Sequence, residues 1–199
     1  MKFSNKEKKD LFIAGAMISL AFAILLAGGY RFIFSLNSGL IIVFIIAFFT
    51  AGIGFLLHEI MHKSVAVSYG LRAEFIANYN MLWIALGASL FGFIFAAPGA
   101  VYISGWNITK ERNGKISLAG PVTNIVLAIV FLILLFIFGA NGILGELFSF
   151  GLTINALLGA FNMIPVMPFD GAKIIAWNKG IYYVTLIVAV GLYVLGWIV

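Results

Sequence analysis

Long apolar stretches separated by short polar segments run through the whole chain. We expect six membrane elements, at about residues 11–29, 39–66, 81–105, 116–138, 147–166 and 180–199. Each stretch is about as long as, or longer than, the roughly 20 residues that a helix needs to cross the hydrocarbon core of a bilayer. The pattern predicts an all-α polytopic membrane protein in which residues 1–199 form a single membrane-embedded domain.

The composition supports this interpretation and excludes several other classes of protein. Of the 199 residues, 63% are hydrophobic and 10% are charged, whereas ordinary soluble domains have roughly 45–50% and about 25%. A soluble chain of this length could not bury so much apolar surface, so we exclude a soluble nucleic-acid-binding module and a disordered chain. The net charge of +5 fits basic loops that face an anionic cytoplasmic leaflet. The expected partner is therefore the lipid bilayer and not a nucleic acid.

The positions of the basic residues predict the orientation in the membrane. The stretch 81–105 is interrupted by Pro98-Gly99 and can return to the side from which it enters. With a cytoplasmic N-terminus, all of the 12 Lys and Arg residues except Arg31 then lie on the cytoplasmic side, as the positive-inside rule favours. We therefore expect five transmembrane helices and a re-entrant element at 81–105, or six helices if this stretch crosses fully. Residues 71–79 add a weak β pattern before it.

The second apolar run carries the sequence His58-Glu59-Ile60-Met61-His62 near its C-terminal end. On a helix, positions four apart share a face, so both imidazoles can bind one ion while Glu59 acts on a water. Ionisable groups in an apolar helix are costly without a compensating partner, and a cation supplies one. The chain has no cysteine, and histidine with carboxylate ligands favours Zn²⁺, although cobalt or manganese would suit the same residue types.

A third ligand has to come from another acidic residue. Besides Glu59, acidic residues lie in the charged N-terminal tail (Glu7 and Asp10), in solvated loops (Glu74 and Glu111), in the outer loop (Glu146) and at Asp170. Asp170 follows the cytoplasmic end of the fifth apolar run, at the depth of His58 and His62. Asp170-Gly171 alone would be typical of a helix-terminating turn. With two histidines at the same depth, we expect Asp170 to be the third metal ligand.

Three motifs together resemble one known family. The sequence His58-Glu59-x-x-His62 is followed by Gly120-Pro121-x-x-Asn124, which would open a helix, and then by Asn162-x-x-Pro165-x-x-Pro168-x-Asp170-Gly171. In this order, over roughly residues 50–180, the motifs are similar to those of the site-2 protease family of intramembrane zinc metalloproteases (peptidase family M50). The chain looks like a compact form of that family, without room for PDZ or CBS domains.

The resemblance implies a role for each matching residue. It implies that His58, His62 and Asp170 bind one Zn²⁺ ion, that Glu59 is the catalytic glutamate, and that Asn162 holds the substrate or polarises its carbonyl. The helix of Gly120 and Asn124 would belong to a three-helix catalytic core, and residues 71–105 would form a β-like or re-entrant element. Asn124 and Asn162 are also typical of hydrogen bonds between membrane helices. Met61 departs from the small residue that is common at this position in the family.

We expect an intramembrane zinc metalloprotease that hydrolyses a peptide bond in or next to a transmembrane segment of a membrane protein substrate. The protein would lie in the cell membrane with its active site near the cytoplasmic side. Two alternatives use the same residues: a membrane metal-ion transporter, and a catalytically silent homologue that binds membrane proteins. A transporter usually needs polar sites along a path, whereas these lie at one depth. A protease with a downstream Glu ligand is disfavoured because Glu146 lies on the opposite side.

Overall fold

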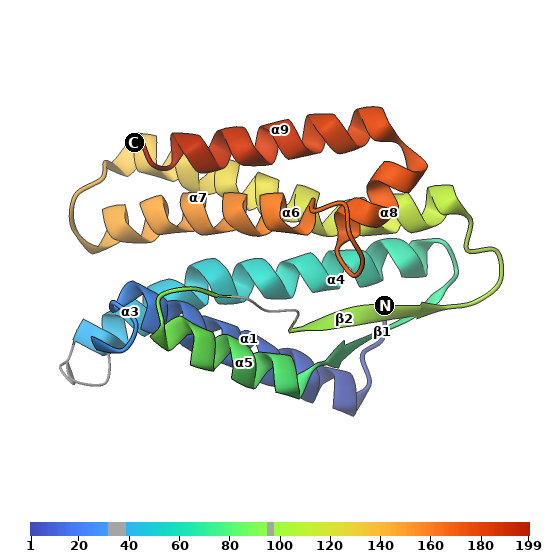
Figure 1. The fold of residues 1–199 in the computed structure, drawn as a ribbon, viewed down its shortest axis with the longest axis horizontal. Helices are drawn as coiled ribbons and strands as arrows, with labels where there is room; N and C mark the ends of the chain where they lie inside the picture. The colour runs from blue at the N-terminus through green and yellow to red at the C-terminus, as the bar shows by residue number, and fades with distance from the viewer. Residues whose placement is uncertain (32–38, 95–97) are drawn as a thin grey trace. The chain divides into compact units, whose positions relative to one another are not determined.

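The computed structural model describes residues 1–31, 39–94 and 98–199, so residues 95–97 of the expected re-entrant stretch 81–105 lie outside the described residues. The described part is mostly helical and has one two-stranded sheet (Figure 1). In chain order the elements are α1 (Asn5–Leu26), α3 (Gly39–Ala47), the π-helical turn η1 (Phe48–Gly52), α4 (Ile53–Ser68), β1 (Arg72–Ala77), α5 (Tyr79–Leu90), β2 (Gly99–Ser104), α6 (Lys110–Phe138), α7 (Gly142–Asn162), α8 (Asp170–Trp177) and α9 (Lys179–Leu195). The expectation of a mostly helical protein with a β-like element before α6 is confirmed.

Four helices within the described residues are long and apolar enough to cross a membrane. They are α1, the continuous helix 39–68 made of α3, η1 and α4, and the two helices α6 and α7. The protein is therefore a multi-pass membrane protein. α5 has 12 residues, and at 1.5 Å per residue it covers only about 18 Å of a hydrocarbon core of about 30 Å. A crossing by α9, which has 17 residues, stays a prediction.

Capping side chains set where two of the long helices begin. The hydroxyl of Ser4 accepts a hydrogen bond from the backbone N–H of Glu7 (3.0 Å), and the hydroxyl of Thr109 accepts one from the N–H of Arg112 (3.2 Å). Such caps satisfy backbone donors that have no partner in the first turn of a helix. α1 and α6 therefore each begin with a polar turn, before the apolar runs that hydropathy detects at 11–29 and 116–138.

One compact unit of the chain consists of residue 1, residues 57–73 and residues 103–199. Within it, α6 packs along α7, α8 packs against α6, and α9 packs against α7. The apolar core between α6 and α7 is built from Ala128, Leu135, Phe148, Leu152 and Ala156. Small residues in this core let the helix backbones approach closely, as is common between membrane helices.

The second compact unit consists of residues 2–56 and 74–102, and here the structure corrects the interpretation of two acidic residues. Glu7 and Asp10 are not part of a solvated tail, because they lie in α1 with exposed fractions of 1% and 3%. A carboxylate oxygen of Glu7 accepts a hydrogen bond from the backbone N–H of Phe75 (3.1 Å), and one of Asp10 accepts from the N–H of Ala77 (3.2 Å). The hydroxyl of Tyr79 donates to the other oxygen of Asp10 (2.6 Å).

These carboxylates occupy one edge of β1. Alternate residues of a strand direct their N–H groups to the same edge, and Phe75 and Ala77 are alternate residues. At the other edge β1 pairs with β2, and the N–H of Asn78 donates to the carbonyl of Pro98 (2.9 Å) just beyond their ends. Gly105, which follows β2, lies beside Leu71, which precedes β1. The two strands therefore run antiparallel.

Candidate metal centre

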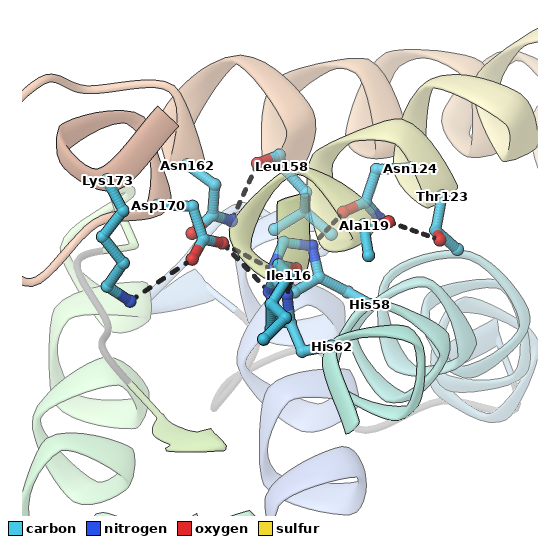
Figure 2. A network of polar contacts seen from close by, with 10 residues as sticks. All are labelled: His58, His62, Ile116, Ala119, Thr123, Asn124, Leu158, Asn162, Asp170 and Lys173. Carbon is cyan, nitrogen blue, oxygen red and sulfur yellow. Dashed lines mark hydrogen bonds and ion pairs between the residues drawn. The ribbon is translucent and has the colours of Figure 1, made fainter. Parts of the chain in front are cut away.

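Residues of α4 and α8 bring three possible metal donors together (Figure 2). Nε2 of His58 lies 3.3 Å from Oδ2 of Asp170, and Nε2 of His62 lies 3.0 Å from the same oxygen. All three residues are buried, and their donor atoms lie within 4.8 Å of one another. The structure therefore brings together the three residues that the sequence singles out. Among the residues that the structure describes, no other group of His, Asp and Glu is arranged to hold an ion in this way.

Hydrogen bonds on the far side of each imidazole fix which ring nitrogen carries the proton. Nδ1 of His62 lies 2.7 Å from the backbone carbonyl oxygen of Ile116, which can only accept, so this nitrogen donates. Nδ1 of His58 lies 2.6 Å from the side-chain oxygen of Asn124, and it donates for the same reason. The Nε2 atom of each neutral ring is then left with a lone pair for a metal. That lone pair is on the side of Asp170.

α6 supplies both of these acceptors from within its length. The sequence predicts that Gly120 and Pro121 open this helix, but they lie inside it. The prediction is wrong because proline is common in the first turn of a helix, whereas here polar residues form additional helical turns before it. Pro121 has no N–H, so the carbonyl of Ser117 lacks its usual helix bond. His62, however, bonds to a different carbonyl, that of Ile116 one residue earlier.

Gly120 keeps open the space between the two histidines. A Cβ atom at this position would contact Nε2 of His58 and Nε2 of His62, and would lie 2.6 Å from Cε1 of His58. Any side chain here would therefore occupy the space on which both lone pairs converge. Glycine at residue 120 provides room for an ion.

The donor set fits zinc. Bonds of about 2.0–2.1 Å in a tetrahedral site place ligand atoms about 3.3 Å apart, and the two nitrogen–oxygen separations are 3.3 and 3.0 Å. Two imidazoles and one carboxylate leave a fourth position for water, as in catalytic zinc sites. With the ring protons on Nδ1, the Nε2 lone pairs of His58 and His62 and the Oδ2 oxygen of Asp170 are three acceptor atoms that meet in a buried site. Such a group is costly to bury without a cation between its members.

The local structure around Asp170 directs only one of its oxygens to the histidines. Asp170 is the first residue of α8, where the positive end of the helix dipole favours a carboxylate. Nζ of Lys173, one turn later, lies 3.6 Å from Oδ1, so Oδ2 alone faces His58 and His62 (Figure 2). The sequence predicts only that Lys173 lies on the cytoplasmic side. It does not predict α8, because a helix of only 8 residues has a weak hydrophobic pattern.

The two expected catalytic residues lie on elements that carry the donors or lead to them. Glu59 is on α4 between the two histidines and is 7% exposed. Asn162 is the last residue of α7, is partly buried, and donates one N–H of its amide to the carbonyl of Leu158 (2.9 Å). The other N–H of this amide is a second hydrogen-bond donor that the side chain can offer. Met61 is 38% exposed, so its bulk does not enter the donor group.

The chain is similar to proteins named as zinc metalloproteases. It is 43% identical over 199 residues to "Putative zinc metalloprotease MJ0611" of Methanocaldococcus jannaschii, and the match covers 98% of both chains. It is 32% identical over 135 residues to "Zinc metalloprotease MJ0392" of the same organism, covering 67% of this chain and 33% of that one. To "Putative zinc metalloprotease YwhC" of Bacillus subtilis it is 29% identical over 140 residues, covering 62% and 64%. No family model matches, and no solved structure is significantly similar.

Proposed function

The chain belongs to the site-2 protease family of zinc metalloproteases, and we propose that it hydrolyses a peptide bond in or next to a transmembrane segment of a membrane protein. The observation that carries the proposal is the buried group of His58, His62 and Asp170. Two of these donors lie on a helix that is long and apolar enough to span a membrane. A peptide bond that reaches them has to come from a substrate at the membrane.

We assign the roles of the residues as follows. His58, His62 and Asp170 would hold one zinc ion, which when bound polarises a carbonyl and lowers the pKa of water to about 7. Glu59, on the same helix as the two histidines, accepts the proton of the attacking water and passes it to the departing amine. General acid–base catalysis of this kind contributes typically about 10²- to 10⁴-fold to a rate.

A helical substrate has to unwind before it can be cut, because an intact helix keeps its carbonyls in hydrogen bonds to the residue four positions later. Segments weakened by Gly or Pro are therefore the preferred substrates. Asn162 would hold the unwound segment or donate a hydrogen bond to the carbonyl oxygen as negative charge develops on it. The Asn162 amide has two N–H groups, of which one donates to the carbonyl of Leu158, and the second is the donor that this role would use.

The site lies close to the cytoplasmic surface of the membrane in this proposal. Lys110, Arg112 and Lys115 precede Ile116 on α6, and the carbonyl of Ile116 holds His62. At 1.5 Å per residue, Arg112 is only about 6 Å along the helix axis from Ile116. Since basic residues gather on the cytoplasmic side, the nearness of this basic turn to His62 supports a site at that side and a cytoplasmic N-terminus.

The test is a cleavage assay with purified protein and a Glu59→Gln variant. Single-span model substrates with a Gly-Pro pair in the span are compared with substrates whose span is uniformly leucine. We expect the wild type to cut the first kind faster, and Glu59→Gln to keep its zinc while losing about 10²- to 10⁴-fold in rate. Cleavage by Glu59→Gln at the wild-type rate would contradict the assignment of the base. Metal flux in proteoliposomes without any cleavage would instead identify a transporter.

A further inference from the structure

A fully buried asparagine in the middle of α7 connects to the candidate zinc ligand His58. Asn155 has an exposed fraction of 0%, and its amide nitrogen donates to the carbonyl of Gly151 (2.9 Å) in its own helix. Its side-chain oxygen accepts from the amide nitrogen of Asn124 on α6 (3.1 Å). The oxygen of Asn124 in turn accepts from Nδ1 of His58 (2.6 Å). Three hydrogen bonds thus run from the backbone of α7 to an imidazole of α4.

The direction of this chain of bonds is set at its start. The carbonyl of Gly151 can only accept, so Asn155 has to turn its nitrogen to Gly151 and its oxygen to Asn124. Asn124 then turns its nitrogen to Asn155 and its oxygen to His58, and Nδ1 of His58 has to donate. If Asn124 were reversed, its nitrogen would face Nδ1, and the imidazole proton would lie on Nε2, where it blocks a metal.

We propose that Asn155 is a positioning residue that, through Asn124, holds His58 in the tautomer and orientation that bind zinc. The inference rests on the zinc site of the proposed function. It explains why α6 and α7 carry a pair of amides in an interface otherwise built from residues such as Ala128, Leu152 and Ala156. Buried amides are costly to place there and add little to packing, whereas an amide has a direction that an apolar residue lacks.

The two histidines are held in different ways, and this difference makes the proposal testable. Nδ1 of His62 bonds directly to a backbone carbonyl, which has no reversed form. Nδ1 of His58 bonds to a side-chain amide, whose two ends are nearly equal in shape and opposite in function. Only His58 therefore depends on a residue that orients its partner. Loss of Asn155 should affect the metal through His58 alone.

The first experiment measures metal binding by purified protein with Asn155 replaced. Asn155→Leu removes both bonds, and Asn155→Ser keeps a hydroxyl that can bond to Gly151, as Thr153 bonds to Ser149, but is too short to reach Asn124. We expect both variants to bind zinc about tenfold more weakly in competition with a chelator, at the low end of the effect of outer-shell residues. The visible spectrum of bound Co²⁺ should change in both. Thr153→Val, on the same helix, is the control and should bind like the wild type.

The second experiment separates positioning from packing. Asn124→Asp presents an oxygen to His58 whichever way the side chain turns, so the orienting role of Asn155 disappears. We expect Asn155→Ser to cost about tenfold in zinc affinity beside Asn124, the low end of the outer-shell range, and less than about twofold beside Asn124→Asp. An equal loss in both backgrounds, or no loss beside Asn124, would overturn the proposal. A wild type that binds neither Zn²⁺ nor Co²⁺ would instead refute the zinc site, and a zinc-bound wild type without cleavage would refute only the proteolysis.

Discussion

Replacing Gly120 by alanine tests the geometry of the metal centre most directly. The added Cβ would lie 2.6 Å from Cε1 of His58, whereas ordinary contacts of a Cβ begin at 3.4 Å, so this atom has to retreat by about 0.8 Å to restore an ordinary contact. Metal–ligand distances tolerate only about 0.2 Å. The Nε2 atoms of His58 and His62 meet the same Cβ, so both nitrogens have to move.

The imidazoles cannot avoid the new methyl group by a shift of α4. Both rings are bonded to α6, His62 through the carbonyl of Ile116 and His58 through Asn124, and α6 is the helix that carries Gly120. Moving α4 away would break these two bonds. We therefore expect Gly120→Ala to lose at least about 100-fold in zinc affinity, the upper end of what loss of an outer-shell partner costs.

The helix α6 itself should still form, because alanine is about 1 kcal/mol better than glycine inside a helix. The control is Gly191→Ala in α9, where a Cβ meets nothing within 4 Å. The assay is the zinc content per chain after dialysis, together with thermal unfolding in detergent. We expect Gly191→Ala to bind like the wild type. One tightly bound zinc per chain in a folded Gly120→Ala protein would refute the reasoning.

Two further predictions concern the acidic residues. Asp170→Asn keeps the size of the side chain but removes the charge beside the two imidazoles. Zinc affinity should therefore fall at least about tenfold, while the midpoint of thermal unfolding without metal changes little. A zinc affinity equal to that of the wild type in a chelator titration would argue against Asp170 as a ligand. Asp10→Ala leaves the N–H of Ala77 and the hydroxyl of Tyr79 without the acceptor seen in the structure, and each such bond to a charged group is worth about 1.5–3 kcal/mol. The unfolding midpoint should fall, and Lys9→Ala, an exposed neighbour, is the control; equal midpoints for the two variants would show that Asp10 does not hold β1.

The parts of the site that could be predicted are those that depend on local spacing or on depth in the membrane. His58 and His62 are four residues apart on one helix, so their common face follows from helix geometry alone. Asp170 lies more than a hundred residues later, yet the end of an apolar run and the basic residues around it place it at the same depth. Both inferences use periodicity and charge, which a single sequence contains.

Other features depend on contacts between distant residues, for which the sequence carries no such signal. Glu7 and Asp10 bond to backbone groups 68 and 67 residues away, on a strand whose β pattern is weak. In the sequence they stand among lysines and are therefore interpreted as solvated. Asn155 is a lone amide in an apolar run, which is more typical of simple contacts between helices, and only the direction of its bonds distinguishes it.

The spacing within the Gly120-Pro121-x-x-Asn124 motif has a physical reason once Ile116 is included. Residues 116, 120 and 124 follow one another at intervals of four, and such positions lie along one face of a helix. On successive turns of α6 this face offers a carbonyl to His62, an open space, and an amide oxygen to His58. His58 and His62 are one turn apart on α4, whereas their partners on α6 are two turns apart, at residues 116 and 124. Both imidazoles therefore approach the turn between these partners, and residue 120 in that turn has to lack a side chain. The glycine and the asparagine are therefore parts of one arrangement whose first member is a backbone atom and so leaves no trace in the sequence.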